Sequence, residues 1–181
     1  ISADGNLVLF TSSATNLVKG DRNDQTDVFL RDRRAHRTIR VSLNGDGEEI
    51  ATGASYDGSA LSADGRFVVF SSNDENLLPG GVNGHSQVVL KDLADGSVTL
   101  VSHNGSGQPG NLDSQFPTIA PGGGFVAFYS TATDLVGGNI NGQFQVYVWN
   151  RITGEIRRAS VDSAGVAAND SAYDQVVSDD G

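Results

Sequence analysis

The most constraining feature of this 181-residue chain is an internal repeat with a period of about 60 residues. The segment NLVLFTSSATNLV at 6–18 returns as RFVVFSSNDENLL at 66–78 and as GFVAFYSTATDLV at 124–136. A repeat of this kind is one supersecondary unit, which must stack on its neighbours to bury its apolar residues. Three periods account for the chain, at about 2–61, 62–119 and 120–177.

Each period is typical of β structure, because short runs of Val, Ile and aromatic residues alternate with Gly, Asn, Asp and Ser. The first period predicts strands at 6–12, 27–32 and 38–42, and a fourth at 55–62 that continues through an Asp-Gly hairpin turn at 64–65. The strand at 6–12 is apolar at consecutive positions, which predicts burial on both of its faces. Four-stranded sheets covered on both faces predict the blades of a β-propeller, and therefore an all-β fold.

The pattern of a period is SADG before an apolar strand that ends F-x-S, a long polar loop, a segment such as TDVFLRD, and a segment such as TIRVS. The last two recur as SQVVLKD and VTLVS, and as FQVYVWN and IRRAS. This pattern resembles the TolB-like propeller repeats of bacterial proteins, and the resemblance covers essentially the whole chain three times. The third period departs from it, since Pro121-Gly122-Gly123 replaces Ala-Asp-Gly and Asn150 replaces the aspartate of the third strand. The resemblance implies a three-bladed propeller segment and a periplasmic or extracellular bacterial location.

The number of blades poses a problem, because known propellers close with about four to eight. The chain begins with only the last stub of an innermost strand, Ile1-Ser2, and ends with a complete one predicted at 172–178. One hypothesis is a homodimer that forms a six-bladed ring, in which each C-terminal strand completes the first blade of its partner. The other is a fragment of a longer propeller. Both remain open at the level of the sequence.

Composition excludes several classes of function. Lys and Arg number 12 against 22 Asp and Glu, so the net charge of −10 argues against general nucleic-acid binding. Apolar runs such as 7–10 are far too short to cross a bilayer, which predicts no membrane span. The chain has no cysteine and no G-x-S-x-G motif, and His36, His85 and His103 fall at unrelated offsets in their periods. We therefore expect no catalytic residues.

The loops at 13–26 and 43–54 are the long connections of the first period, and alternating strand directions place them on one face. Long loops tend to carry function, so a site is expected on this face. The residues that repeat in all three periods are explained by the architecture of a blade. Residues found in a single period are the candidates for a site.

One such candidate is the loop sequence GDRNDQTD, whose equivalents in the later periods are nearly uncharged. Its oxygen-bearing side chains offer the ligands that calcium takes in proteins, and the proposed metal ligands are Asp21, Asn23, Asp24 and Asp27. The loop is no EF-hand, because Thr26 stands where that motif requires glycine. A solvated acidic loop without a metal is the favoured alternative.

Two further features have both a functional and a structural interpretation. Five arginines crowd one short stretch, which predicts either a site for an anionic glycan or lipid headgroup or a charged edge strand that discourages sheet association. The edge strand is the favoured interpretation; the arginines are Arg31, Arg33, Arg34, Arg37 and Arg40. Tyr147 and Trp149 either face a sugar-binding surface or fill the core between blades.

The sequence thus predicts a non-catalytic propeller scaffold or recognition module with long polar loops on one face. A protein or a glycan is its expected ligand, and calcium is its candidate cofactor. The alternative is a part of the propeller domain of an extracellular hydrolase or lyase.

Overall fold

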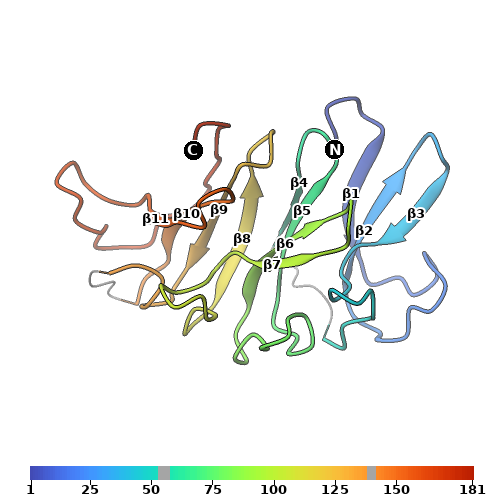
Figure 1. Ribbon diagram of the computed structural model, residues 1–181, viewed down its shortest axis with the longest axis horizontal. Coiled ribbons are helices and arrows are strands. Elements are labelled where there is room, and N and C mark those ends of the chain that lie inside the picture. The colour runs from blue at the N-terminus through green and yellow to red at the C-terminus, as the bar shows by residue number, and fades with distance from the viewer. Residues whose placement is uncertain (53–57, 138–141) are drawn as a thin grey trace.

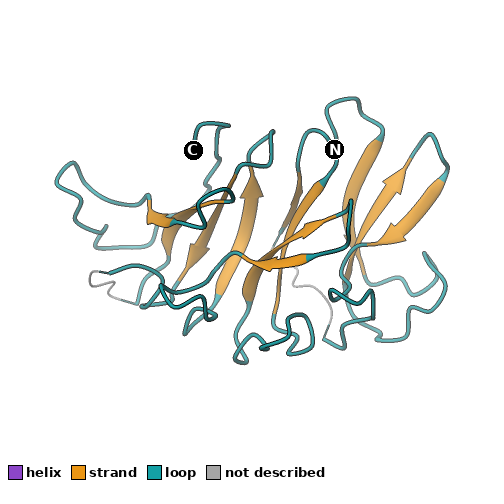
Figure 2. Ribbon diagram, in the orientation of Figure 1, coloured by secondary structure: helices purple, strands orange, loops and turns teal. Residues whose placement is uncertain are grey.

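The computed structural model describes residues 1–52, 58–137 and 142–181, and these residues form strands and loops without any helix (Figures 1 and 2). Accordingly, no helix in the described part of the chain could span a membrane. The strands form three antiparallel sheets that follow one another along the longest axis of the molecule (Figure 1). We call these sheets blades 1, 2 and 3, in chain order.

Blade 1 has three strands, β1 (Leu7–Ser12), β2 (Asp27–Asp32) and β3 (Arg37–Arg40), in that order. Blade 2 has four in sequential order: β4 (Ser59–Leu61), β5 (Phe67–Ser72), β6 (Gln87–Asp92) and β7 (Val98–Leu100). Blade 3 repeats this order with β8 (Ser114–Ile119), β9 (Phe125–Ser130), β10 (Gln145–Asn150) and β11 (Ile156–Arg158). The all-β propeller architecture expected from the repeat is confirmed.

Blade 1 has three strands, as expected from the stub Ile1-Ser2 of its innermost strand. One strand differs from the sequence expectation. Residues 172–178, where a complete strand is predicted, form no strand, and Asp174 among them has a positive φ of 59°. The strand predicted at 55–62 is described only in part, as β4, since 53–57 lie outside the described residues.

The core lies between the blades. All six residues of β5 are buried: Val68 and Phe70 pack with blade 1, and Phe67 and Val69 pack with blade 3. By contrast, β1 is only partly buried, because a blade covers just one of its faces. Burial of the middle blade on both faces is what consecutive apolar residues predict for a sheet between two others.

The tight turns between first and second strands lock each blade to the one before it. The N–H of Ala3 donates to the carbonyl of Ala63 at 2.8 Å. In the same way, the N–H of Ala63 donates to the carbonyl of Pro121 at 2.8 Å. Pro121 has no N–H to continue this series, but the N–H of Gly122 bonds the Asp179 carboxylate at 2.6 Å. The Pro-Gly-Gly variant of the third period therefore keeps the turn.

The two faces of the molecule differ as the sequence predicts. Both chain ends and the short turns lie along one side of the ribbon, and the long loops lie along the opposite side (Figure 1). The strands β2, β6 and β10 each follow a long loop, so their first residues lie toward the long-loop face.

Candidate functional site

A serine–carboxyl or serine–amide pair is repeated at the long-loop end of every blade. The Ser42 hydroxyl donates to Asp27 at 2.6 Å, and the same bond joins Ser102 to Gln87 at 2.6 Å. Blade 3 repeats it between Ser160 and Gln145 at 2.7 Å. Each serine oxygen also accepts a backbone N–H at the start of the neighbouring strand, as from Val28 to Ser42 at 3.0 Å. This serine pair is therefore part of the blade architecture.

Blade 1 alone adds a group of buried charges to this pair, which we call the acidic cluster: Asp21, Asp27 and Glu49. The carboxylates surround the guanidinium of Arg40, whose Nη1 lies 3.2 Å from Asp21, 3.2 Å from Asp27 and 2.6 Å from Glu49. The side chains of Asp21 and Asp27 are 2% and 0% exposed, and that of Arg40 is 8% exposed. Three acids thus share one buried cation.

The carboxylates of this cluster differ in their acidity. Burial raises the pKa of Asp21, and the attraction of Arg40 offsets this effect only in part. Burial also acts to raise the pKa of Glu49, but the hydrogen bonds from the Arg22 N–H and from Arg40 outweigh it, so this pKa is lowered. Asp21 differs because its Oδ1 is buried and accepts no hydrogen bond. Asp21 is therefore a less stabilised anion than Glu49.

The structure brings together only some of the predicted metal ligands. Asp21 and Asp27 meet in the acidic cluster, and Asn23 lies beside them, donating to Asp27 at 3.2 Å and to the Ile50 carbonyl at 3.0 Å. Asp24 has a φ of 52° and its side chain is exposed, outside the cluster. Asn83 repeats the contact of Asn23 with a bond to the Gly110 carbonyl, so this asparagine is structural.

Sequence reasoning missed Glu49 and Arg40 as members of this site. Glu49 corresponds to Pro109 in the second period and to Ala167 in the third, so the single-period criterion would have identified it. Arg40 corresponds to Leu100 and to Arg158, so that criterion would not have identified it. The chemistry of the donor set suits a hard cation, but the Arg40 guanidinium already lies among the three carboxylates. A calcium ion would have to displace it.

The five clustered arginines do not act together. Arg40 points into the acidic cluster, whereas Arg34 pairs with Asp4 at 2.9 Å near the short turns. Arg31 donates to the Thr38 hydroxyl, and Arg33 donates to the Gly5 carbonyl. Their contacts tie the outer strands and turns of blade 1 together, as a charged edge requires.

The remaining candidates are structural too. Tyr147 and Trp149 belong to the apolar core between blades 2 and 3 and are almost fully buried. The histidines stay apart, with His85 3.4 Å from Asp113 and His103 Nδ1 2.9 Å from the Asn104 carbonyl.

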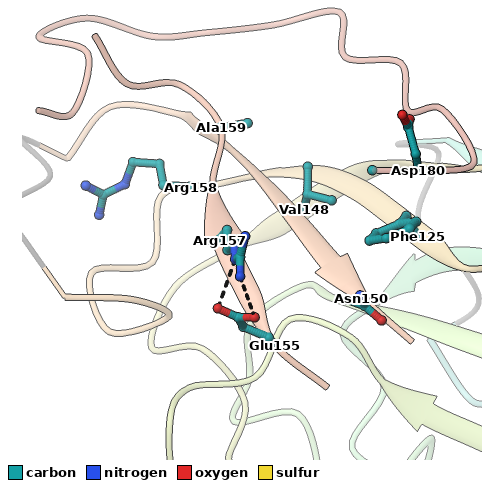
Figure 3. Close-up of a pocket in the computed structure, with 9 residues that line it drawn as sticks. Phe125, Val148, Asn150, Glu155, Arg157, Arg158, Ala159 and Asp180 are labelled. Atoms are coloured by element: carbon teal, nitrogen blue, oxygen red, sulfur yellow. Dashed lines mark hydrogen bonds and ion pairs between the residues drawn. The ribbon is translucent and has the colours of Figure 1, made fainter. Parts of the chain in front are cut away.

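The outward face of blade 3 carries a cavity of about 410 Å³. Phe125 and Val148 line it on one side, and Glu155 and Arg157 form a two-bond ion pair across it, with distances of 2.9 and 3.0 Å (Figure 3). Gly181 lies against Phe125 as Gly123 lies against Phe67. This cavity is thus the counterpart of the filled space between blades 2 and 3.

A second single-period feature, which sequence reasoning also missed, lies on blade 3 and the segment after it. Three rings pack around Tyr129: Phe116 at 5.3 Å, Tyr173 at 5.7 Å and Phe144 at 6.4 Å between ring centroids. Phe144 and Tyr173 also contact each other, at 6.2 Å. We call these four residues the aromatic cluster. Unlike Tyr147 and Trp149, two of its members, Phe116 and Tyr173, are exposed.

The fold is that of known propellers. Over 91% of this chain, it resembles TolB from Acinetobacter baumannii, at 14% identity and a TM-score of 0.55, and putative TolB from Agrobacterium tumefaciens, at 18% identity and 0.57. It also resembles the tricorn protease over 87% of the chain, at 14% identity and a TM-score of 0.50. The chain spans only 32%, 45% and 12% of these three proteins, respectively. No family model and no curated protein sequence matches it.

Proposed function

We propose that this chain is a non-catalytic propeller module that recognises a ligand through side chains found in one period only. The observation that supports this proposal is the contrast between its two single-period features. The acidic cluster is closed off by Arg40, with Asp27 fully buried. The aromatic cluster is open, since the side chains of Phe116 and Tyr173 remain 43% and 59% exposed. Exposed large apolar side chains that lie together are typical of binding surfaces.

A peptide array and a glycan array, both probed with the labelled chain, test this proposal. A recognition module retains members of one array and leaves them chemically intact, as mass spectrometry of the bound ligands would show. Absence of binding on both arrays, or cleavage of the retained ligands, would contradict a non-catalytic recognition role.

We also propose a homodimer, in which a second copy of the chain covers the outward faces of blades 1 and 3. Tyr129 of the aromatic cluster faces outward from blade 3, so this proposal competes with ligand binding at that cluster. The partial burial of β1, compared with the complete burial of β5, supports a missing neighbour at that end. In this structure Gly181 lies against Phe125. In the closed ring, the equivalent turn at 2–5 of the partner would need the same place, so one of the two turns would have to move away. Light scattering coupled to size-exclusion chromatography tests this: the proposal predicts twice 18.9 kDa, and a folded monomer would contradict it.

Calcium binding stays a prediction, and a periplasmic or extracellular location stays a proposal that the TolB-like fold supports. The alternative function is a part of the propeller domain of a hydrolase, for which the likeness to the tricorn protease is the supporting observation. A peptidase domain in the same polypeptide as these blades would support that alternative.

A further inference from the structure

The aromatic cluster is not required by the blade architecture. Its members Phe116, Tyr129, Phe144 and Tyr173 correspond in the preceding period to Gly58, Ser71, Ser86 and Gln115. Blades 2 and 3 therefore pack against each other with small or polar side chains at the positions that are aromatic one period later. The interface between blades 2 and 3 therefore forms without aromatic residues at these positions.

Phe116 has a backbone conformation that is unfavourable for its residue type. Its φ is 51°, and the equivalent residues Gly58 and Asp174 also have positive values, 92° and 59°. The irregularity in the pairing of β8 with β9, between Gln115 and Thr118, surrounds this residue. Glycine adopts such a conformation freely, whereas a bulky side chain there is strained. Strained residues and β-bulges cluster at functional sites.

The ring of Phe116 also gains little from burial, since it is 43% exposed. It contacts Tyr129 on one side, while Tyr173 presents a second exposed ring next to Tyr129. Val176, three residues beyond Tyr173, is 90% exposed. The result is an apolar surface on which rings stand open to solvent.

The chain around this surface is acidic. Residues 93–181, which contain the whole aromatic cluster, carry three basic residues, Arg151, Arg157 and Arg158, against nine acidic ones, Glu155 and eight aspartates. The aspartates are Asp95, Asp113, Asp134, Asp162, Asp170, Asp174, Asp179 and Asp180. Asp174 is exposed and lies directly at the cluster, because its N–H donates to the Tyr129 hydroxyl at 2.8 Å.

We propose that the aromatic cluster binds a peptide segment in which an aromatic or aliphatic side chain is flanked by Lys or Arg. The apolar side chain packs on the rings of Phe116 and Tyr173, and the flanking cations lie over ring faces and near Asp174. The excess of aspartates speeds the encounter and disfavours acidic partners. This inference rests on the proposed recognition function and names its ligand class.

Isothermal titration calorimetry with three synthetic peptides tests the inference. Ac-KFKFK-amide is expected to bind, whereas Ac-EFEFE-amide and Ac-KSKSK-amide are expected to bind at least tenfold more weakly. Phe116→Gly and Tyr173→Gln install the residues of the preceding period, and each is expected to weaken Ac-KFKFK-amide at least tenfold. Ile152→Ser is the matched control, because Ile152 is an exposed apolar residue of the turn between β10 and β11. It should leave the affinity unchanged.

The inference is overturned if Ac-KFKFK-amide does not bind, if the acidic peptide binds equally well, or if Phe116→Gly and Tyr173→Gln behave as Ile152→Ser does. Circular dichroism of each variant establishes that it is folded before it is titrated. Retention of an uncharged glycan on the array, with no binding of Ac-KFKFK-amide, would overturn the inference but leave the recognition function standing. Absence of binding on both the peptide array and the glycan array would overturn the recognition function itself.

Discussion

Phe116 occupies the position in blade 3 that Gly58 occupies in blade 2, and both residues have positive φ angles, 51° and 92°. A Cβ added to Gly58 would lie 3.4 Å from the Cα of Phe116, so the two positions also touch. Both blades therefore have a left-handed residue here, and in blade 3 that residue is a phenylalanine.

This relationship predicts that glycine at position 116 gives a more stable chain than alanine, which is the reverse of the usual order in a strand. Phe116→Gly and Phe116→Ala both lose the ring contact with Tyr129, but only glycine relieves the backbone. We expect the glycine variant to be more stable than the alanine variant by about 1 kcal/mol in urea denaturation. The same pair at Thr118, in regular β8, should show the opposite order. An alanine variant at 116 as stable as the glycine variant would mean that the backbone is not strained.

Arg40 is expected to be needed for the stability of the fold only while the carboxylates of the acidic cluster are present. Arg40→Leu installs the residue of the second period and leaves the buried carboxylates of Asp21 and Asp27 without their cation. Removing one partner of a buried ion pair costs about 3–5 kcal/mol. Adding Asp27→Gln, which recreates the pair of Gln87 and Leu100, should recover part of this loss. Failure of the second change to recover any stability would show that Asp27 does not depend on Arg40.

The unequal acidity of the cluster predicts a pH-dependent gain from Asp21→Asn. The pKa of Asp21 is raised in the folded state, so the folded chain binds its proton more tightly than the unfolded chain. The contribution of this group to stability is therefore full below the ordinary aspartate pKa and is lost as the pH rises through the raised value. Asp21→Asn should raise the melting temperature at pH 7 and have a smaller effect near pH 3.5. A lower melting temperature at pH 7 would contradict this.

Calcium should act on the acidic cluster only once Arg40 is removed. We expect millimolar calcium to leave the melting temperature of the unmodified chain unchanged and to raise that of Arg40→Leu, because the freed carboxylates are suitable ligands. Magnesium at the same ionic strength is the control. Stabilisation of the unmodified chain by calcium would instead support the predicted metal site.

The turns that join the blades predict a difference between two glycines. Both Gly123 and Gly5 have positive φ, but an added Cβ at Gly123 would lie 2.5 Å from the Phe67 ring, whereas none would touch anything at Gly5. Gly5→Ala should cost about 1 kcal/mol from backbone strain alone. Gly123→Ala should cost at least 1 kcal/mol more, because it also disrupts packing between blades. Equal losses in chemical denaturation would show that the turn does not lock the blades.

The fold could be predicted from the sequence because one pattern occurs three times, so that each strand is supported by two equivalents. The strand expected at 27–32 coincides with β2, and burial of β5 on both faces follows from its apolar run. The repeat extends to the loops as well, because Asn23 and its equivalent Asn83 each donate to a backbone carbonyl, of Ile50 and Gly110 respectively.

The candidate site was harder to predict, because its members come from segments far apart in the sequence. Arg40 reaches Asp21 and Glu49 only because strand pairing brings the ends of β2 and β3 beside two loops. Likewise, Phe116 and Tyr173 are 57 residues apart and meet across Tyr129. Period alignment could have identified these residues as exceptional, but not that one set is buried and the other exposed.

The central claim is that the buried acidic cluster maintains blade 1, while the exposed aromatic cluster binds the ligand. Calorimetric titration of Ac-KFKFK-amide into two folded double variants tests this claim most directly. The account predicts unchanged affinity for Asp27→Gln with Arg40→Leu, and at least a tenfold loss for Phe116→Gly with Tyr173→Gln. The reverse pattern, with affinity lost in the first variant and kept in the second, would contradict it.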